Sequence, residues 1–391
     1  MPSKRTCSCS KIAWKGRSGW RLSNGLIEII VLTGGGHLAS LRRVDVNSPN
    51  LLFEATWKTI EPFRYRVSKH KRLYGPRPAG PFLGGFTGHA VALGYFGAPS
   101  DLEIAAGLPL HGEAASLQWR ILSTRVTRKS AHLEMAVQEP AMQLSLVREL
   151  TIHAGESLVH IRERVTNNRK SDNFLQWVQH ATFGEPLLSP TVSRITIPAI
   201  RGCTWPLGYE GKSLLMDKKS FQWPAAPMQG GGTTDLSRAF ISEGTGFVAA
   251  ALIDTSRLHG FVAVSNPKIR LAAGYWFPRS TYPWVTLWEE NRARDYAPWN
   301  GSTQSRGLEF GTTPFPLGLA KAVQDGPMFN TPTLLTLGPY ETKSLDYAVF
   351  ACELPGRCSV EDIRLRHSSL ELISSEPQQR LVLGEVHSQL T

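Results

Sequence analysis

Apolar and polar residues alternate with a period of two in the clearest stretches of the chain. The pattern holds over residues 131–137, 144–152 and 159–165, and turn-forming residues separate them at Glu139-Pro140 and Ala154-Gly155. Successive side chains of a β-strand point to opposite faces, so each stretch predicts a strand with one buried face. Three such strands in close succession predict an antiparallel meander.

Short apolar stretches bounded by turn residues continue along the chain, and none shows a helical period for more than about three turns. With 35 Gly and 26 Pro, the 391 residues favour turns and strands. Strands that bury one face must pack sheet against sheet. We therefore predict an all-β fold, a large antiparallel β-sandwich. Further strands are expected at residues 26–32, 194–197, 246–253, 260–264, 284–288 and 344–350.

The predicted sandwich occupies residues 18–365 as one domain, because no low-complexity linker divides the chain. Residues 1–17 are basic and lack an apolar pattern, which predicts a disordered leader. Residues 366–391 are mostly polar and are expected to form a C-terminal tail. Residues 47–100 are rich in Pro, Gly and aromatic side chains, and such a long irregular segment usually covers a functional site.

The net charge of +11 arises from 43 Lys and Arg against 32 Asp and Glu. The cations are scattered and no nucleic-acid-binding motif accompanies them, so we expect a solvated basic surface and no nucleic-acid partner. No apolar run approaches the ~20 residues needed to span a membrane, and none forms a signal peptide. The sequence thus favours a cytoplasmic protein without membrane association.

The five cysteines are odd in number and dispersed, which argues against a disulfide framework. Cys7 and Cys9 have no His or Cys pair at zinc spacing, so no metal site is predicted there.

Three stretches carry candidate chemistry. His180 ends an aromatic and apolar run, and its imidazole could exchange a proton near neutral pH; a core histidine bonded to a carbonyl is the alternative. In an extended segment His111 and Glu113 share one face, although Glu113 could instead pair with an arginine. Glu309 lies in an apolar run, where a carboxylate is costly unless it is paired or functional.

Other carboxylates are open to a second interpretation. Asp235 follows three glycines and is equally compatible with an Asx turn. Glu289 and Glu290 are the main rivals of Glu309, but adjacent residues of a strand face opposite ways, so only one of them could enter a groove.

Four motifs in order along the chain resemble the aldose 1-epimerase or galactose mutarotase-like superfamily. They are Leu110-His-Gly112, the segment from Val165-Thr-Asn-Asn168 to Trp177-Val-Gln-His180, Thr234-Asp235, and Gly307-Leu-Glu-Phe310. The chain departs from the family pattern at Gln179 and Phe310, where the family commonly has Asn and Pro. The early arginine of the family has three candidates here, Arg64, Arg66 and Arg72.

The resemblance implies a galactose mutarotase-like supersandwich and an isomerase that interconverts the anomers of a monosaccharide or sugar derivative. It implies Glu309 as the base and His180 as the acid, with His111 and Asp235 holding hydroxyl groups. Glu113 is a further candidate for the substrate site. Neither a cofactor nor a metal is expected for this reaction.

Aromatic side chains suit the apolar faces of a sugar, and Trp177 is the first candidate. Trp276, Trp284, Trp288 and Trp299 are the others, and one or two of the five are expected to touch ligand.

Two other functions remain open on the same fold. One is a lyase or hydrolase of a modified glycoside, with a divalent metal held by His111, Glu113, His180 and one of Glu289, Glu290 or Glu309. The other is a carbohydrate-binding protein without catalytic activity.

Overall fold

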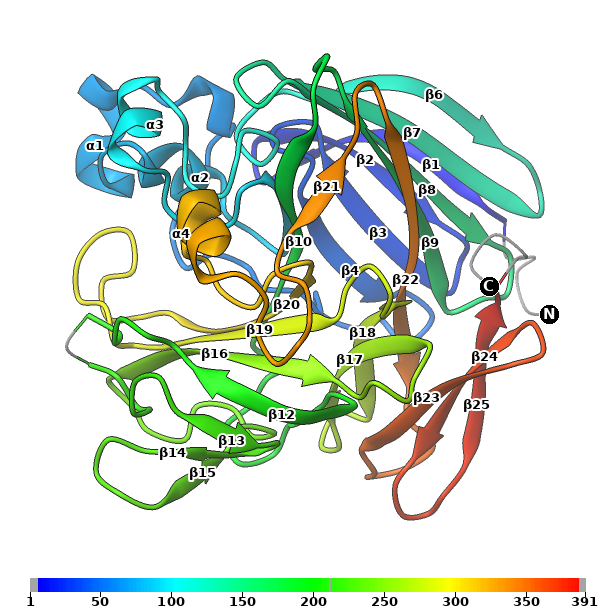
Figure 1. Cartoon of the computed structure of the whole chain (residues 1–391). Helices are drawn as coiled ribbons and strands as arrows, with labels where there is room; N and C mark the ends of the chain where they lie inside the picture. The colour runs from blue at the N-terminus through cyan, green and yellow to red at the C-terminus, as the bar shows by residue number, and fades with distance from the viewer. Residues whose placement is uncertain (1–5, 211, 387–391) are drawn as a thin grey trace.

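Two large antiparallel sheets stack face to face in the computed structural model, which describes residues 6–210 and 212–386 (Figure 1). The prediction of an all-β antiparallel sandwich is confirmed. The larger sheet has 12 strands, in the order β1 (Ser8–Trp14), β2 (Arg17–Ser23), β3 (Ile27–Leu32), β4 (Leu38–Arg43), β5 (His89–Gly94), β10 (Asn173–Gly184), β20 (Gln304–Gly311), β19 (Trp284–Asn291), β16 (Thr245–Ile253), β12 (Ala199–Thr204) and β13 (Ser220–Gln222), with β21 (Leu335–Leu337) paired to β10.

The second sheet has eight strands and contains the predicted meander as β7, β8 and β9. Its register places Leu133 opposite Leu150 and Leu150 opposite Ile161, so the apolar positions form one continuous buried face. In spatial order the strands are β11 (Arg194–Thr196), β17 (His259–Asn266), β18 (Leu271–Pro278), β22 (Thr342–Glu353), β9 (Leu158–Asn167), β8 (Leu144–His153), β7 (Ser130–Glu139) and β6 (Arg120–Val126).

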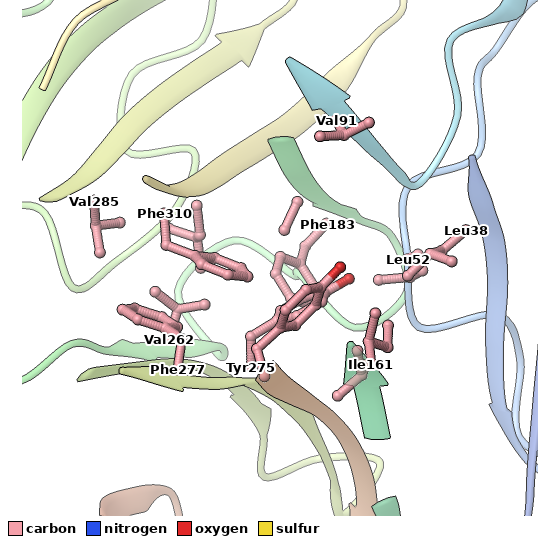
Figure 2. Close-up of a cluster of buried hydrophobic side chains, with 14 of the residues drawn as sticks. Leu38, Leu52, Val91, Ile161, Phe183, Val262, Tyr275, Phe277, Val285 and Phe310 are labelled. Carbon is pink, nitrogen blue, oxygen red and sulfur yellow. The ribbon is translucent and has the colours of Figure 1, made fainter. Parts of the chain in front are cut away.

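The main core lies between these two sheets, as Figure 2 shows for part of it. Phe310 of β20 and Phe277 of β18 stack with their ring centroids 4.3 Å apart. Tyr275 and Phe183 meet edge to face across the same interface, so both sheets contribute aromatic side chains to it.

A buried polar network crosses this core. Arg148 and Glu163 are both fully buried and form an ion pair at 2.6 Å. Glu163 also accepts hydrogen bonds from Gln179 Nε2 at 2.7 Å and from Trp177 Nε1 at 3.1 Å. Because Trp177 and Gln179 belong to β10 and Glu163 to β9, the network ties the two sheets together.

Short helices gather on one side of the molecule, next to β10 and β20 (Figure 1). They include η1 (Pro62–Arg64), α1 (Val67–Tyr74), α2 (Ala79–Gly85) and α3 (Asp101–Ala105), while α4 (Gly318–Asp325) comes from a later part of the chain. The segment 47–100, expected to be irregular, therefore contains helices, together with the fully buried strand β5. In the part of the chain that is described, no helix combines the length and the apolar character that crossing a membrane requires.

The predicted leader and tail are both wrong where the structure describes them. Residues 8–14 form strand β1 at the edge of the larger sheet, where Ile12 and Trp14 pack against a small apolar cluster, and β2 already begins at Arg17. Residues 1–5 and 387–391 lie outside the described residues. Residues after 366 contribute to a three-stranded sheet of β23 (Val360–Arg366), β24 (Ser369–Ser374) and β25 (Arg380–Glu385). A separate two-stranded sheet consists of β14 (Ala225–Pro227) and β15 (Thr233–Asp235).

The three-stranded sheet covers the second large sheet from outside. Leu370, Leu372 and Leu383 form a second apolar cluster with Leu158 and Trp276. The apolar residues alternate with Ser, Glu and Gln, and this mixed composition made the segment resemble a polar tail.

Candidate active site

A cavity of about 700 Å³ lies on the outer face of the larger sheet, over its central strands. Along β10 the odd-numbered positions, including Trp177 and Phe183, point into the sandwich core, whereas His180 faces the other way. Glu309 comes from the neighbouring strand β20, and Thr286 and Trp288 come from β19. The sheet therefore forms the floor of the cavity.

The cavity walls come from segments that cover this floor. Helix α2 and the residue after it contribute aromatic side chains, and two loops close the other side. Wall residues include Phe82, Leu83, Phe86, Leu110, His111, Trp205, Leu207, Tyr209, Glu210, Arg294, Tyr296 and Trp299. The segment 47–100 thus forms part of the cavity wall, and its covering of a functional site stays a prediction.

His180 and Glu309 face each other on the floor. The distance from His180 Nε2 to Glu309 Oε1 is 3.3 Å, and both side chains are almost completely buried. Glu309 Oε1 nevertheless has no hydrogen-bond partner within residues 6–210 and 212–386. A buried carboxyl oxygen without a partner is costly, which suggests that a ligand provides the missing contact.

Burial shifts the two groups in opposite directions. It raises the pKa of the Glu309 carboxyl well above its ordinary value, because the ionised form loses its hydration. It lowers the pKa of the His180 imidazole to about 4 for the same reason. Burial therefore favours the neutral form of both groups, a protonated carboxyl and an unprotonated imidazole.

The orientation of His180 fits this state. Its Nδ1 lies 3.2 Å from Thr182 Oγ1, two residues along the same strand. In the tautomer with hydrogen on Nδ1, this nitrogen donates to Thr182 and the lone pair of Nε2 faces Glu309. The rings of Phe86 and His111 pack edge to face against the His180 ring at 5.5 and 5.1 Å and fix its plane.

His111 is the third polar group beside the floor. Its Nδ1 accepts a hydrogen bond from the Gly97 backbone N–H at 3.1 Å, so the proton of the neutral ring is on Nε2. Burial, followed by the charge of a protonated His180, lowers the pKa of His111 well below its ordinary value. His111 can therefore donate one hydrogen bond.

Two glycines are required by this arrangement. Gly112 has φ of +81°, and a Cβ there would overlap the carbonyl oxygen of Leu93, so the turn after His111 needs glycine. A Cβ at Gly307 would fall on Glu309 Oε1. Glycine at 307 therefore leaves the space that the carboxyl group occupies.

Three of the six predicted site residues, His111, His180 and Glu309, line the cavity. Asp235 does not: it accepts hydrogen bonds from Ser237 in an Asx turn on β15. Glu113 is also outside it, because its carboxylate accepts from the backbone N–H groups of Ala141 and Met142. The prediction that His111, His180, Asp235 and Glu309 share one cavity is thus wrong for Asp235.

Trp177 is completely buried in the sandwich core, where its indole bonds Glu163. Of the other candidate tryptophans, Trp288 and Trp299 line the cavity, whereas Trp276 and Trp284 do not. Two of the five candidates thus line the cavity, and their contact with a ligand stays a prediction.

The rival carboxylates have structural partners. Glu289 pairs with the buried Arg306. Glu290 accepts hydrogen bonds from Tyr209 OH at 2.8 Å and from the Ala293 backbone. None of the early arginines, Arg64, Arg66 and Arg72, lines the cavity.

Several cavity residues were missed by the sequence analysis, Phe82, Phe86, Tyr209 and Arg294 among them. They lie on a short helix and on loops, where no period marks them. The recurrence of aromatic residues in segment 47–100 was the one available signal.

No three His, Cys, Asp or Glu side chains are grouped to hold a metal ion anywhere in the described ranges. In particular, Glu113 cannot join His111 and His180 as a metal ligand, because its carboxylate accepts hydrogen bonds from the backbone of Ala141 and Met142.

The fold is that of the galactose mutarotase-like proteins. The structure is similar to a protein described as a candidate aldose 1-epimerase from Klebsiella pneumoniae, with a TM-score of 0.62 and 16% identity, over 90% of this chain and 85% of that one. It is also similar to a galactose mutarotase-like protein from Clostridium acetobutylicum, with a TM-score of 0.58 and 13% identity, over 89% and 99% of the two chains. The sequence matches no protein-family model and no curated protein.

Proposed function

We propose that this protein is a carbohydrate-active isomerase that interconverts the anomers of a sugar by general acid–base catalysis. The observation that carries the proposal is the His180–Glu309 pair, 3.3 Å apart on the cavity floor. The pair supplies one proton donor and one proton acceptor, and the carboxyl oxygen lacks a partner among the residues described. The mutarotase-like fold is consistent with a sugar as substrate.

The chemistry requires two proton transfers. An acid protonates the ring oxygen while a base removes the proton of the anomeric hydroxyl; the bond from the anomeric carbon to the ring oxygen breaks and a carbonyl group forms. The open chain rotates about the bond next to the carbonyl, and the ring closes on the other face. The two protons then return, so the sugar and the enzyme are restored.

The pKa directions favour Glu309 as the acid and His180 as the base for ring opening. This is the reverse of the roles that the family resemblance implies. Ring opening then converts a neutral pair into an imidazolium–carboxylate ion pair, whose attraction in a site of low dielectric offsets the cost of charging both groups. Ring closure returns the proton to Glu309.

The test is a screen of aldoses and O-substituted aldoses by NMR exchange between anomers. The wild-type protein should accelerate exchange for at least one sugar. Glu309→Gln and His180→Asn should each lower the rate ~10²–10⁴-fold, the usual contribution of one acid or base. Affinity should change less than about tenfold in both variants.

A matched variant is Phe174→Ala, which removes a half-exposed aromatic residue from the same strand, away from the cavity. It should exchange anomers like the wild type. Sugar binding without any accelerated exchange, or full activity in Glu309→Gln, would contradict the proposal.

A further inference from the structure

Several polar side chains around His111, His180 and Glu309 are already bonded within the protein. Thr286 Oγ1 donates to the Pro314 carbonyl at 2.8 Å. Tyr209 OH donates to Glu290 at 2.8 Å and accepts from Trp288 Nε1 at 3.0 Å. These groups are bonded to one another or to the backbone and have little capacity left for a ligand.

The charged groups at the rim are likewise paired. Arg294 Nε donates to Glu210 Oε1 at 3.1 Å, and its guanidinium lies 4.7 Å from the ring centre of Tyr209 and 5.0 Å from that of Trp299. The hydroxyl of Tyr296 donates to the second oxygen of Glu210 at 2.7 Å. Since cation and carboxylate neutralise each other, the rim favours no ionic ligand.

The remaining lining is apolar and reaches the mouth. Leu207 is 70% exposed and Tyr296 is 49% exposed at the edge of the cavity. Large apolar side chains exposed beside a cavity commonly mark a surface that a ligand covers. The inner apolar lining comprises Ala79, Phe82, Leu83, Phe86, Ala98, Leu110, Trp205, Val248, Trp288, Trp299 and Pro316.

These observations conflict with an unsubstituted aldose as the preferred ligand. Most carbons of an aldose carry a hydroxyl group, and a buried hydroxyl without a partner is unfavourable. In the described cavity His111, His180 and Glu309 can serve the reacting end of a sugar, and the remaining lining offers mainly aromatic and aliphatic surface. The volume of about 700 Å³ also lies in the range of cavities for drug-sized ligands.

We propose that the cavity takes a neutral sugar derivative with a large apolar group, aromatic or branched aliphatic, at the end of the ring distant from the anomeric carbon. The hemiacetal end lies at the His180–Glu309 pair, and the apolar group lies between the aromatic walls and Leu207. This inference rests on the proposed function for the orientation of the sugar, but the preference for an apolar substituent depends on the walls alone.

The experiment compares the 6-O-benzyl ethers of glucose and galactose with the unsubstituted sugars. Binding is measured by calorimetry on the full chain. At least one benzyl ether should bind about tenfold tighter than its parent sugar, because its ring replaces water against apolar walls. Leu207→Asn, a change at an exposed position, should reduce this ratio, and Trp299→Ala should reduce it further if the variant melts cooperatively.

Phe174→Ala is the control and should keep the wild-type ratio. Equal affinity for benzyl ether and parent sugar, or tighter binding of the parent, would overturn the inference. Tight binding of the ether without anomeric exchange would refute the isomerase and leave the ligand class standing. Exchange of free aldoses without a preference for the benzyl ether would support the isomerase and refute the proposed ligand class.

Discussion

Burial in an apolar environment favours the neutral form of the Glu309 carboxyl group, and this has a consequence for stability. Its pKa is raised in the folded protein, so the unfolded chain releases the proton more readily than the folded chain does. The sign follows from linkage: as pH rises above ~4.5, the unfolded state is increasingly favoured until the folded pKa is passed.

Glu309→Gln should therefore stabilise the protein while it lowers activity. The amide has a similar shape and does not ionise, so the gain at pH 8 should be on the order of 1 kcal/mol or more. The gain should be smaller at pH 5, where less of the unfolded state is ionised. Thermal or denaturant unfolding of both proteins at the two pH values checks this. A gain independent of pH would contradict the raised pKa.

The pH dependence of turnover should also follow from the pair. The pKa of His180 is lowered to about 4, so the imidazole is available as a base above that pH. Glu309 can act as an acid only below its raised pKa. The rate should rise through about pH 4 and fall as pH passes the raised pKa of Glu309.

The measurement is kcat/KM for anomeric exchange across the pH range, corrected for the uncatalysed reaction. A rate that instead falls as pH rises through ~6.5, the ordinary imidazole value, would indicate that a protonated His180 is the acid.

Sequence reasoning identified His111, His180 and Glu309 because short motifs surround them. The same reasoning placed Trp177 in the site, although residues three apart on a strand face opposite sides, so the period of two already separates Trp177 from His180. Asp235 and Glu113 could not be excluded in this way. Both are used by turns, and their hydrogen-bond partners become visible only in three dimensions.

Strand β20 positions the carboxyl group of Glu309, the proposed acid, with the help of a glycine two residues earlier. Residues 307 and 309 lie on the same face of the strand. A methyl group at 307 would fall on Glu309 Oε1, which is the end of a flexible side chain and can move aside.

Gly307→Ala should consequently leave the fold intact and displace the carboxyl group. Activity should fall by about 10²-fold or more, because misplacement by about 1 Å is enough for a loss of this size. Anomeric exchange and the melting temperature are measured together. Gly230→Ala is the control, because nothing lies within 4 Å of a Cβ there. A variant with wild-type activity would show that Glu309 need not keep its position.

Strands were easier to predict than the elements between them. The meander of β7, β8 and β9 could be predicted because one face of each strand is buried and the other is solvated, which gives an alternating sequence pattern. Strand β5 has no such contrast, since all its residues are buried, and it was not predicted. The short helices α1 and α2 are held mainly by their packing, which local sequence does not show.

At the scale of the whole molecule, the C-terminal sheet of β23, β24 and β25 forms a third layer over the second large sheet. Leu370 and Leu372 pack against Phe261 and Trp276 of the second large sheet. This interface closes a face of the sandwich that would otherwise present apolar side chains to water.

A chain ending at Pro355 should therefore be less stable than the full chain by several kcal/mol, the order expected when a few large apolar side chains lose their cover. It should also associate, because the uncovered patch is apolar. Denaturant unfolding and size-exclusion chromatography measure the two effects. A truncated protein with wild-type stability would mean that the sheet is dispensable.

Point variants test the same interface without truncation. Leu372→Ala, at a fully buried position, should cost ~2–5 kcal/mol. Val382→Ala is the control, because this residue of β25 is 65% exposed and its loss should cost less than about 0.5 kcal/mol.

The architecture of two packed sheets could be predicted from the sequence, but the strands at residues 8–14 and after Arg366 could not. The sequence of β1 mixes Ser and Lys with Ile and Ala, and the strands after Arg366 mix Leu with Ser and Glu. Each is a strand with one covered side, and what covers it comes from distant parts of the chain.

The alternation along β10 bears on how this protein can diverge over evolutionary time. Odd positions such as Trp177 and Gln179 are constrained because they lie in the core and donate hydrogen bonds to Glu163. On the opposite face, His180 lines the cavity and Val178 packs with Ala92 and Phe96. Substitutions on the cavity side of β10 could thus change what the cavity binds over the course of evolution, while the core side of the same strand stays unchanged.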